Sequence, residues 1–306
     1  MNSQTRSLSL PGIAALIAAL VIAAPFLYGL HVQSTMAPLS ADMLSVQLTS
    51  FIASLVYRTG VVFLIVRWHG EHRDQLAFRR PALLLTVYAL CLLAWQVAQI
   101  FIIQSVVRSL ANDGARLTVI VTLIAPLSAA LYAFVAWFAW WFVTRMFRND
   151  AIPVAPRGHA ARRIAGLAAW LFASVLLLFM TQAVTMLLDY YDDDLKLVML
   201  NYLGAVAIPA ALAFAGAMLG LPRDLARLHG WRLLGASLVA MASIALLAYG
   251  ALHLLGNVFG SVSLLSGMLT IVVLAGICVA YWVWFRVFYA PVDRDTAETS
   301  QGMQSS

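Results

Sequence analysis

Residues 132–163 read YAFVAWFAWWFVTRMFRNDAIPVAPRGHAARR. The first half of this segment is apolar and rich in aromatic side chains, whereas the rest holds five arginines, two prolines and a glycine. Aromatic rings with a polar edge gather where a membrane helix meets the lipid headgroups, and arginines stay on the cytoplasmic side. The segment therefore predicts a helix that leaves the membrane near Arg145, followed by a basic cytoplasmic linker over residues 149–163.

The composition of the whole chain excludes a water-surrounded globular domain. Of the 306 residues, 63% are hydrophobic and only 10% are charged, and the mean hydropathy is +0.89. Soluble domains carry about 25% charged residues. The net charge of +6 does not indicate nucleic-acid binding, because the arginines lie in short segments beside apolar runs, which is an orientation signal. We therefore expect the lipid bilayer to be the main partner, and we expect no nucleic-acid partner.

On both sides of residues 132–163, apolar runs recur that are long enough to cross a bilayer as a helix, which takes about twenty residues. Lipid cannot hydrogen-bond to exposed backbone, so such runs must be helical. We predict an all-α integral membrane protein with eight transmembrane helices over residues 11–30, 44–67, 82–107, 117–143, 164–188, 197–220, 233–255 and 262–288.

The first of these runs has a second interpretation, a cleaved signal peptide. Arg6, the apolar residues after it and the small pair Ala23 and Ala24 fit that pattern. Apolarity nevertheless continues through residues 25–30, past any such cleavage point. We favour an uncleaved first span, and the orientation of the other seven is the same in either case.

The distribution of positive charge predicts the orientation. With the N-terminus inside, three cationic residues fall in outer segments, namely Arg108, Arg116 and Lys196, and fifteen fall in inner segments. The inner fifteen are Arg6, Arg67, Arg73, Arg79, Arg80, Arg145, Arg148, Arg157, Arg162, Arg163, Arg223, Arg227, Arg232, Arg286 and Arg294. This positive-inside bias predicts a multi-pass protein of a bacterial inner membrane with both termini in the cytoplasm.

The linker divides the chain into two halves that resemble each other. We predict a first four-helix half over residues 1–148, a second over 164–290, and a disordered cytoplasmic tail over 291–306. The fourth run ends in VAWFAWW (135–141) and the eighth in VAYWVWF (279–285). A parallel 4+4 repeat, as in some transporters, is one interpretation; the other is that aromatic and arginine-rich helix ends recur in any membrane protein.

Arg58 is the clearest candidate for function, because it lies deep inside the second run. A charge at such depth costs at least about 2.5 kcal/mol on insertion scales and is usually functional or paired. At helical spacing Arg58 shares a face with Gln47, Ser50 and Ser54.

Two further runs carry polar stripes that we expect to face this one across the bundle interior. The third run offers Tyr88, Cys91, Trp95 and Gln99 on one face with Gln96 at its edge, and the fifth offers Ser174, Thr181 and Thr185 with Gln182 beside them. One interpretation is a polar cavity whose base is a cation, suited to an anionic or amphiphilic ligand. The other is a set of interhelical hydrogen bonds that satisfy one another.

The sequence holds little that indicates catalysis or a cofactor. No carboxylate falls at mid-membrane depth, and the two cysteines have no metal-binding spacing. His253 near the outer end of the seventh run could bind a ligand, although a lone histidine there is more often a hydrogen-bonded interfacial residue. We expect no metal, no cofactor and no catalytic residue. A protein without enzymatic activity is favoured over a divergent membrane enzyme that acts on lipid with His253 and its neighbours.

Small residues in the later runs predict close helix packing instead. Gly216-x-x-x-Gly220, Ala211-x-x-x-Ala215 and Gly276-x-x-x-Ala280 would let helix backbones approach one another in lipid. Two functions then stay open. One is transport or binding of an amphiphilic or anionic small molecule, with Arg58, Ser54, Gln96, Gln99, Thr181, Gln182 and His253 as candidate ligand-binding residues. The other is a non-catalytic partner or sensor subunit that engages another membrane protein.

Overall fold

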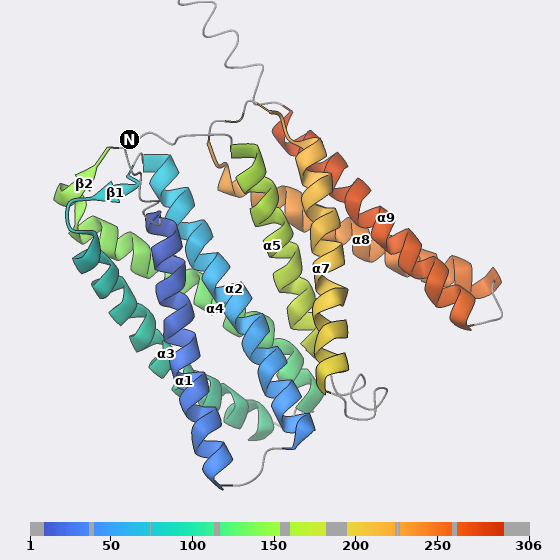
Figure 1. The fold of residues 1–306 in the computed structure, drawn as a ribbon, viewed down its shortest axis with the longest axis horizontal. Coiled ribbons are helices and arrows are strands. Elements are labelled where there is room, and N and C mark those ends of the chain that lie inside the picture. Colours follow the sequence, from blue (N-terminus) through green and yellow to red (C-terminus); the bar gives the residue numbers. More distant parts are fainter. Residues whose placement is uncertain are drawn as a thin grey trace, which may run out of the picture. The chain divides into compact units, whose positions relative to one another are not determined.

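The computed structural model describes residues 9–36, 40–73, 75–112, 117–153, 160–181, 195–223, 225, 227–258 and 262–290 (Figure 1). Within these ranges, eight helices are long and apolar enough to cross a membrane. The chain is thus an all-α multi-pass membrane protein, as its apolar runs predict. The tail predicted over residues 291–306 lies outside the described residues.

The helices are α1 (Leu10–Met36), α2 (Ala41–Arg73), α3 (Pro81–Asn112), α4 (Leu117–Met146), α5 (Ala160–Met180), α7 (Leu195–Gly220), α8 (Gly230–Val258) and α9 (Val262–Tyr289). A 3-10 turn, η1 (Arg148–Asp150), and the short strands β1 (Ala77–Phe78) and β2 (Ala151–Ile152) lie in the described connections. The chain forms two compact units. The first comprises Met1–Pro156 and Leu177–Val198, and the second comprises Arg157–Leu176 and Met199–Ser306.

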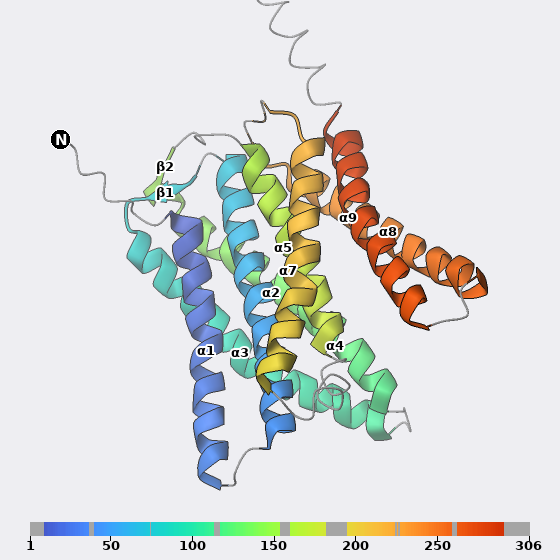
Figure 2. The same cartoon turned by 45° about the vertical axis from the view of Figure 1, so that its right-hand side comes forward.

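The first unit is built from α1 to α4. Helix α1 packs against α2 and α3, and α4 packs against the same two helices, an arrangement that can be followed in Figures 1 and 2. Aromatic side chains fill the contact between α3 and α4, where the rings of Tyr88 and Trp140 meet edge to face with centroids 5.2 Å apart. Both side chains are fully buried.

A two-stranded ribbon ties the segment after α2 to the segment after α4. β1 and β2 are antiparallel, with Ala77 opposite Ile152, and the amide of Arg79 donates to the carbonyl of Asp150 at 2.8 Å. Both segments therefore lie at the same end of the first unit (Figure 1). Two of the arginine-rich segments predicted to share one side of the membrane therefore lie beside each other in the fold.

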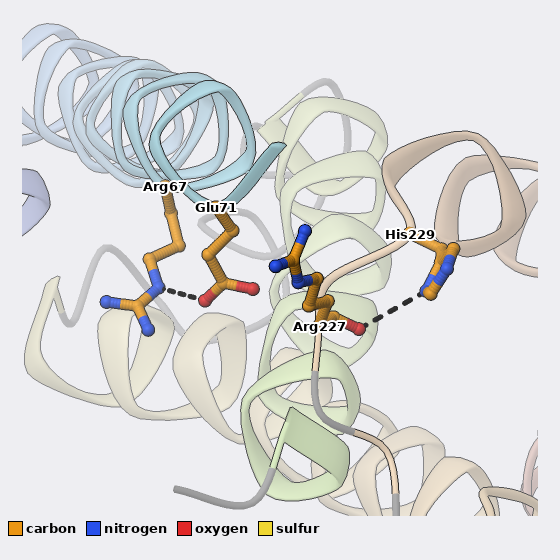
Figure 3. Close-up of polar contacts among 4 residues, drawn as sticks. All are labelled: Arg67, Glu71, Arg227 and His229. Atoms are coloured by element: carbon orange, nitrogen blue, oxygen red, sulfur yellow. Dashed lines mark hydrogen bonds and ion pairs between the residues drawn. The ribbon is translucent and has the colours of Figure 1, made fainter. Parts of the chain in front are cut away.

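Helix α2 continues past residue 67, where the sequence predicted its end, and reaches Arg73. Arg67 and Glu71 are therefore helical and not part of a loop. One turn apart on α2, they form an ion pair between the Arg67 Nε and a Glu71 carboxylate oxygen (Figure 3), and such i,i+4 pairs support a helix. Arg73 in the last turn also interacts favourably with the negative end of the helix dipole.

The linker predicted over residues 149–163 contains secondary structure at both of its ends. Its first residues form η1 and β2, residues 154–159 lie outside the described ranges, and α5 begins at Ala160. Arg162 and Arg163 consequently belong to a helix, since alanine and arginine are strong helix formers. The amide of Ala160 donates to the carbonyl of Leu225 at 2.9 Å, which satisfies one of the donors left open at a helix start.

In the second unit, α7 lies against α9 through its glycines. A β-carbon at Gly216 would collide with the carbonyl oxygen of Cys278, and one at Gly220 with that of Trp282. Only glycine permits so close a backbone approach, which confirms the packing predicted from Gly216-x-x-x-Gly220.

Helices α8 and α9 are joined by polar contacts in the middle of α8 and just before its start. The Trp284 Nε1 donates to the Ser243 hydroxyl at 2.9 Å, and the Tyr289 hydroxyl donates to the carbonyl of His229 at 3.3 Å. The Nδ1 of His229 lies 3.3 Å from the carbonyl oxygen of Arg227 (Figure 3), which fixes the imidazole ahead of the helix.

Candidate functional site

Arg58 lies midway along the part of α2 that is a candidate membrane span, from Met43 to Arg73. At the rise of an α-helix, this places Arg58 about 22 Å from either end. Its side chain is half-buried in the first unit. Arg58 is thus far from both ends of a long apolar helix, and its position relative to the bilayer stays a prediction.

Two glutamines of α3 accept hydrogen bonds from the guanidinium. Arg58 Nη1 donates to the Oε1 of Gln96 at 2.5 Å, and Nη2 donates to the Oε1 of Gln99 at 3.1 Å. The Nε2 of Gln99 donates in turn to the hydroxyl of Ser128 at 2.8 Å. A chain of polar groups therefore connects α2, α3 and α4.

Aromatic side chains flank the same guanidinium. The Cζ of Arg58 lies 4.9 Å from the ring centroid of Tyr132 on α4, within the range of a cation–π interaction. The hydroxyl of neighbouring Tyr57 donates to the carbonyl of Ala129 at 2.7 Å. These contacts fix the position of α2 against α4 and hold the charge in place.

All of these partners are neutral. Among the described residues, no carboxylate forms an ion pair with Arg58. A guanidinium has several N–H donors, and only two are used in the bonds to the glutamines. Since a buried charge is most stable when it is paired, an anion that could reach Arg58 would be attracted to it.

A cleft of about 460 Å³ leads to this position between α1, α2 and α3. Its volume is in the range of small-molecule sites, about 300–1,000 Å³. Helix α1 supplies a mainly apolar wall, and α2 supplies the polar stripe that ends at Arg58. The lining residues are Ile22, Pro25, Phe26, Gly29, Leu30, Gln33, Val46, Gln47, Ser50, Phe51, Ser54, Arg58 and Gln96.

Contacts between α1 and α2 lie at the end of the cleft away from Arg58 and about midway along it. The Gln47 Nε2 donates to the Oε1 of Gln33 at 2.8 Å, and the rings of Phe26 and Phe51 stack with centroids 4.0 Å apart. From Gln47 to Arg58 the helix rises about 16 Å. The cleft thus combines an apolar wall, an uncharged polar stripe and a cation at its inner end.

The structure brings together four of the sequence-predicted site residues. Arg58 and Gln96 are hydrogen-bonded and line the cleft, Ser54 lines it one turn before Arg58, and Gln99 is buried behind them. Their role in ligand binding stays a prediction, because geometry alone does not test it.

The other three candidates do not join this group. The hydroxyl of Thr181, just after α5, donates to the carbonyl of Leu177 at 2.7 Å and is not part of the cleft lining, and Gln182 lies outside the described residues. His253 belongs to the second unit, where its exposed ring packs edge to face on Tyr249 at 4.5 Å. This contact fits the interfacial alternative for His253. Among the described residues, no group of three or more His, Cys, Asp or Glu could hold a metal ion.

Sequence reasoning missed the contribution of α1, which forms one whole wall of the cleft. A signal was present, since Ile22, Phe26, Gly29 and Gln33 recur at the three- and four-residue spacing of one helix face. The contacts of Tyr132 and Ser128 were also missed, because a run of apolar residues does not reveal which neighbour each face will meet.

Comparison of the chain with protein-family models, curated proteins and solved structures finds no match.

Proposed function

We propose that the first unit binds an amphiphilic molecule with an anionic group, as a transporter or a membrane-embedded binding protein. The anionic group would pair with Arg58, and the apolar part would lie against the wall formed by α1. The observation that carries this proposal is the set of neutral partners around a mid-membrane cation at the end of a cleft. The cation is positioned by its glutamines and left without a counter-ion among the described residues.

The orientation that we propose follows the distribution of arginines. The ends of α2 and α4 and their connecting segments would face the cytoplasm of a bacterial inner membrane, as would both termini. The β1–β2 ribbon supports the shared side of these two segments, and the positive-inside rule supports the cytoplasmic assignment. In this orientation the α1–α2 connection, near Gln33 and Gln47, faces outward.

The alternative is a non-catalytic partner or sensor that engages another membrane protein. It rests on the basic inner loops and on small-residue helix faces, both of which could engage a partner. One of these faces, at Gly216 and Gly220, packs on α9 of the same chain and is not open to a partner.

Identification of co-purifying compounds by mass spectrometry tests the proposal. Wild type, Arg58→Ala and the control Arg108→Ala would be purified in a mild detergent. Arg108 is exposed on α3 and does not line the cleft. We expect an anionic amphiphile with wild type and the control that is depleted about tenfold or more with Arg58→Ala, as loss of a charged hydrogen bond predicts. Equal amounts in all three would contradict the proposal, and a protein retained by all three would favour the partner role.

A second variant keeps Arg58 and fills the cleft. Gly29 lines the cleft, and a β-carbon at this position would meet no atom within 4 Å. Gly29→Phe should therefore displace the ligand without disturbing the backbone. Gly250→Phe is the matched control, because Gly250 on α8 also has open space and lies outside the cleft. Ligand retained by Gly29→Phe at the wild-type level would argue against this cleft as the binding site.

A further inference from the structure

A second, strongly basic cavity lies at the end of the first unit that carries the β1–β2 ribbon. It has a volume of about 540 Å³, and we call it the arginine pocket. Three arginines, two further polar side chains and one tryptophan surround it: Arg73, Gln75, Trp141, Thr144, Arg145 and Arg148. None of these residues belongs to the Arg58 cleft, so the pocket is a separate site.

The fold builds this pocket from two helix ends that are far apart in the sequence. The β1–β2 ribbon holds the segment after α2 beside the segment after α4. The amide of Gln75 donates to the carbonyl of Gly70 at 2.9 Å, so the chain turns back onto the end of α2. Gly70 leaves room for this turn, because a β-carbon there would crowd the Leu76 side chain and the Gln75 carbonyl.

The positive charge of the pocket is not neutralised by the described part of the chain. Arg73, Arg145 and Arg148 are exposed, and no described carboxylate forms an ion pair with them. The nearby carboxylate of Glu71 is paired with Arg67, and Asp150 does not line the pocket.

One of the three guanidinium groups is held against the pocket wall. The Cζ of Arg145 lies 5.5 Å from the ring centroid of Trp141. The hydroxyl of buried Thr144 lies 3.3 Å from the Nε2 of His69, which joins the ends of α4 and α2 beneath the pocket. Arginines from two helices can thus approach one ligand together.

We propose that the arginine pocket binds a phosphate group, from the headgroup of an anionic phospholipid or from a soluble phosphate compound. Guanidinium groups match phosphate oxygens with paired hydrogen bonds. The pocket lies where α4 passes from its aromatic segment into its arginines, the level at which tryptophan meets lipid headgroups. Basic pockets between membrane helices are suited to anionic headgroups at that level.

Native mass spectrometry of the full chain with defined lipids tests this proposal. Wild type would be offered equal amounts of phosphatidylglycerol and phosphatidylcholine, and inorganic phosphate would be added separately. The test variant carries Arg73→Gln, Arg145→Gln and Arg148→Gln. The control carries Arg79→Gln, Arg80→Gln and Arg223→Gln, three exposed arginines outside the pocket, so that both variants lose the same charge. The single variant Arg145→Gln is included in case the triple variant does not fold.

We expect wild type and the control to prefer phosphatidylglycerol, and the test variant to lose this preference by about tenfold or more. Arg145→Gln should show a partial loss. If millimolar inorganic phosphate binds wild type and displaces the lipid, the ligand is a soluble phosphate; if it does not, the ligand is the lipid headgroup. An equal loss in test and control variants, or no loss in either, would overturn the proposal.

Discussion

Arg58 can remain charged inside the membrane because its neighbours share the cost. Two glutamine carbonyls accept its hydrogen bonds and the Tyr132 ring faces its charge. Each interaction is individually modest, because hydrogen bonds to charged groups contribute about 1.5–3 kcal/mol. None of these neighbours provides a negative charge. We assign an anionic ligand to the cleft because Arg58 has no counter-ion among the described residues.

At the residue scale, we predict that Gln99→Leu destabilises the first unit. The substitution removes an acceptor from Arg58 and a donor to Ser128, and Gln99 is buried. The expected loss is about 1–3 kcal/mol, measured as a lower midpoint of thermal unfolding in detergent. Gln104→Leu, at an exposed position of the same helix, should have little effect. Equal midpoints for the two variants would show that the polar chain does not support the fold.

At the scale of the elements, the helices of the second unit depend on close backbone contact. Gly216→Ala places a β-carbon against the Cys278 carbonyl, so α7 and α9 must separate. Overpacking of this kind costs about 1–3 kcal/mol. Gly204→Ala on the same helix meets no atom within 4 Å and should be neutral or slightly stabilising, because alanine favours helix over glycine. Thermal unfolding of the two variants checks this, and equal stability would contradict the contact.

The sequence was a good guide to the elements and a partial guide to the site. Eight apolar runs predicted eight spanning helices, because lipid imposes a minimum length and a helical backbone. The sequence did not predict the end of α2, where the Arg67–Glu71 pair lies in the helix. It predicted the stripe from Gln47 to Arg58 from periodicity, but not the wall formed by α1, since periodicity does not specify a neighbour.

At the scale of the whole molecule, the proposed orientation depends on which segments of the first unit share a side of the membrane. The ribbon places Arg79 and Asn149 on one side, and α1 and α2 place Ser40 at the other end of the first unit. We predict that Arg79→Cys and Asn149→Cys react with an impermeant maleimide only after the inner membrane is opened.

The labelling requires a background in which the free thiols Cys91 and Cys278 are replaced by alanine. Ser40→Cys, which is exposed, should react in intact spheroplasts. If Arg79→Cys and Asn149→Cys label from opposite sides, the fold of the first unit is wrong. If both label from outside, the proposed orientation is reversed.

The most direct test of the central claim is a cryo-electron microscopy map of the full chain in nanodiscs made from its native lipids. We expect elongated density in the cleft between α1, α2 and α3, with one end in hydrogen-bond contact with Arg58. A map in which α1 closes onto α2 and α3, and in which Arg58 contacts only protein groups, would contradict it.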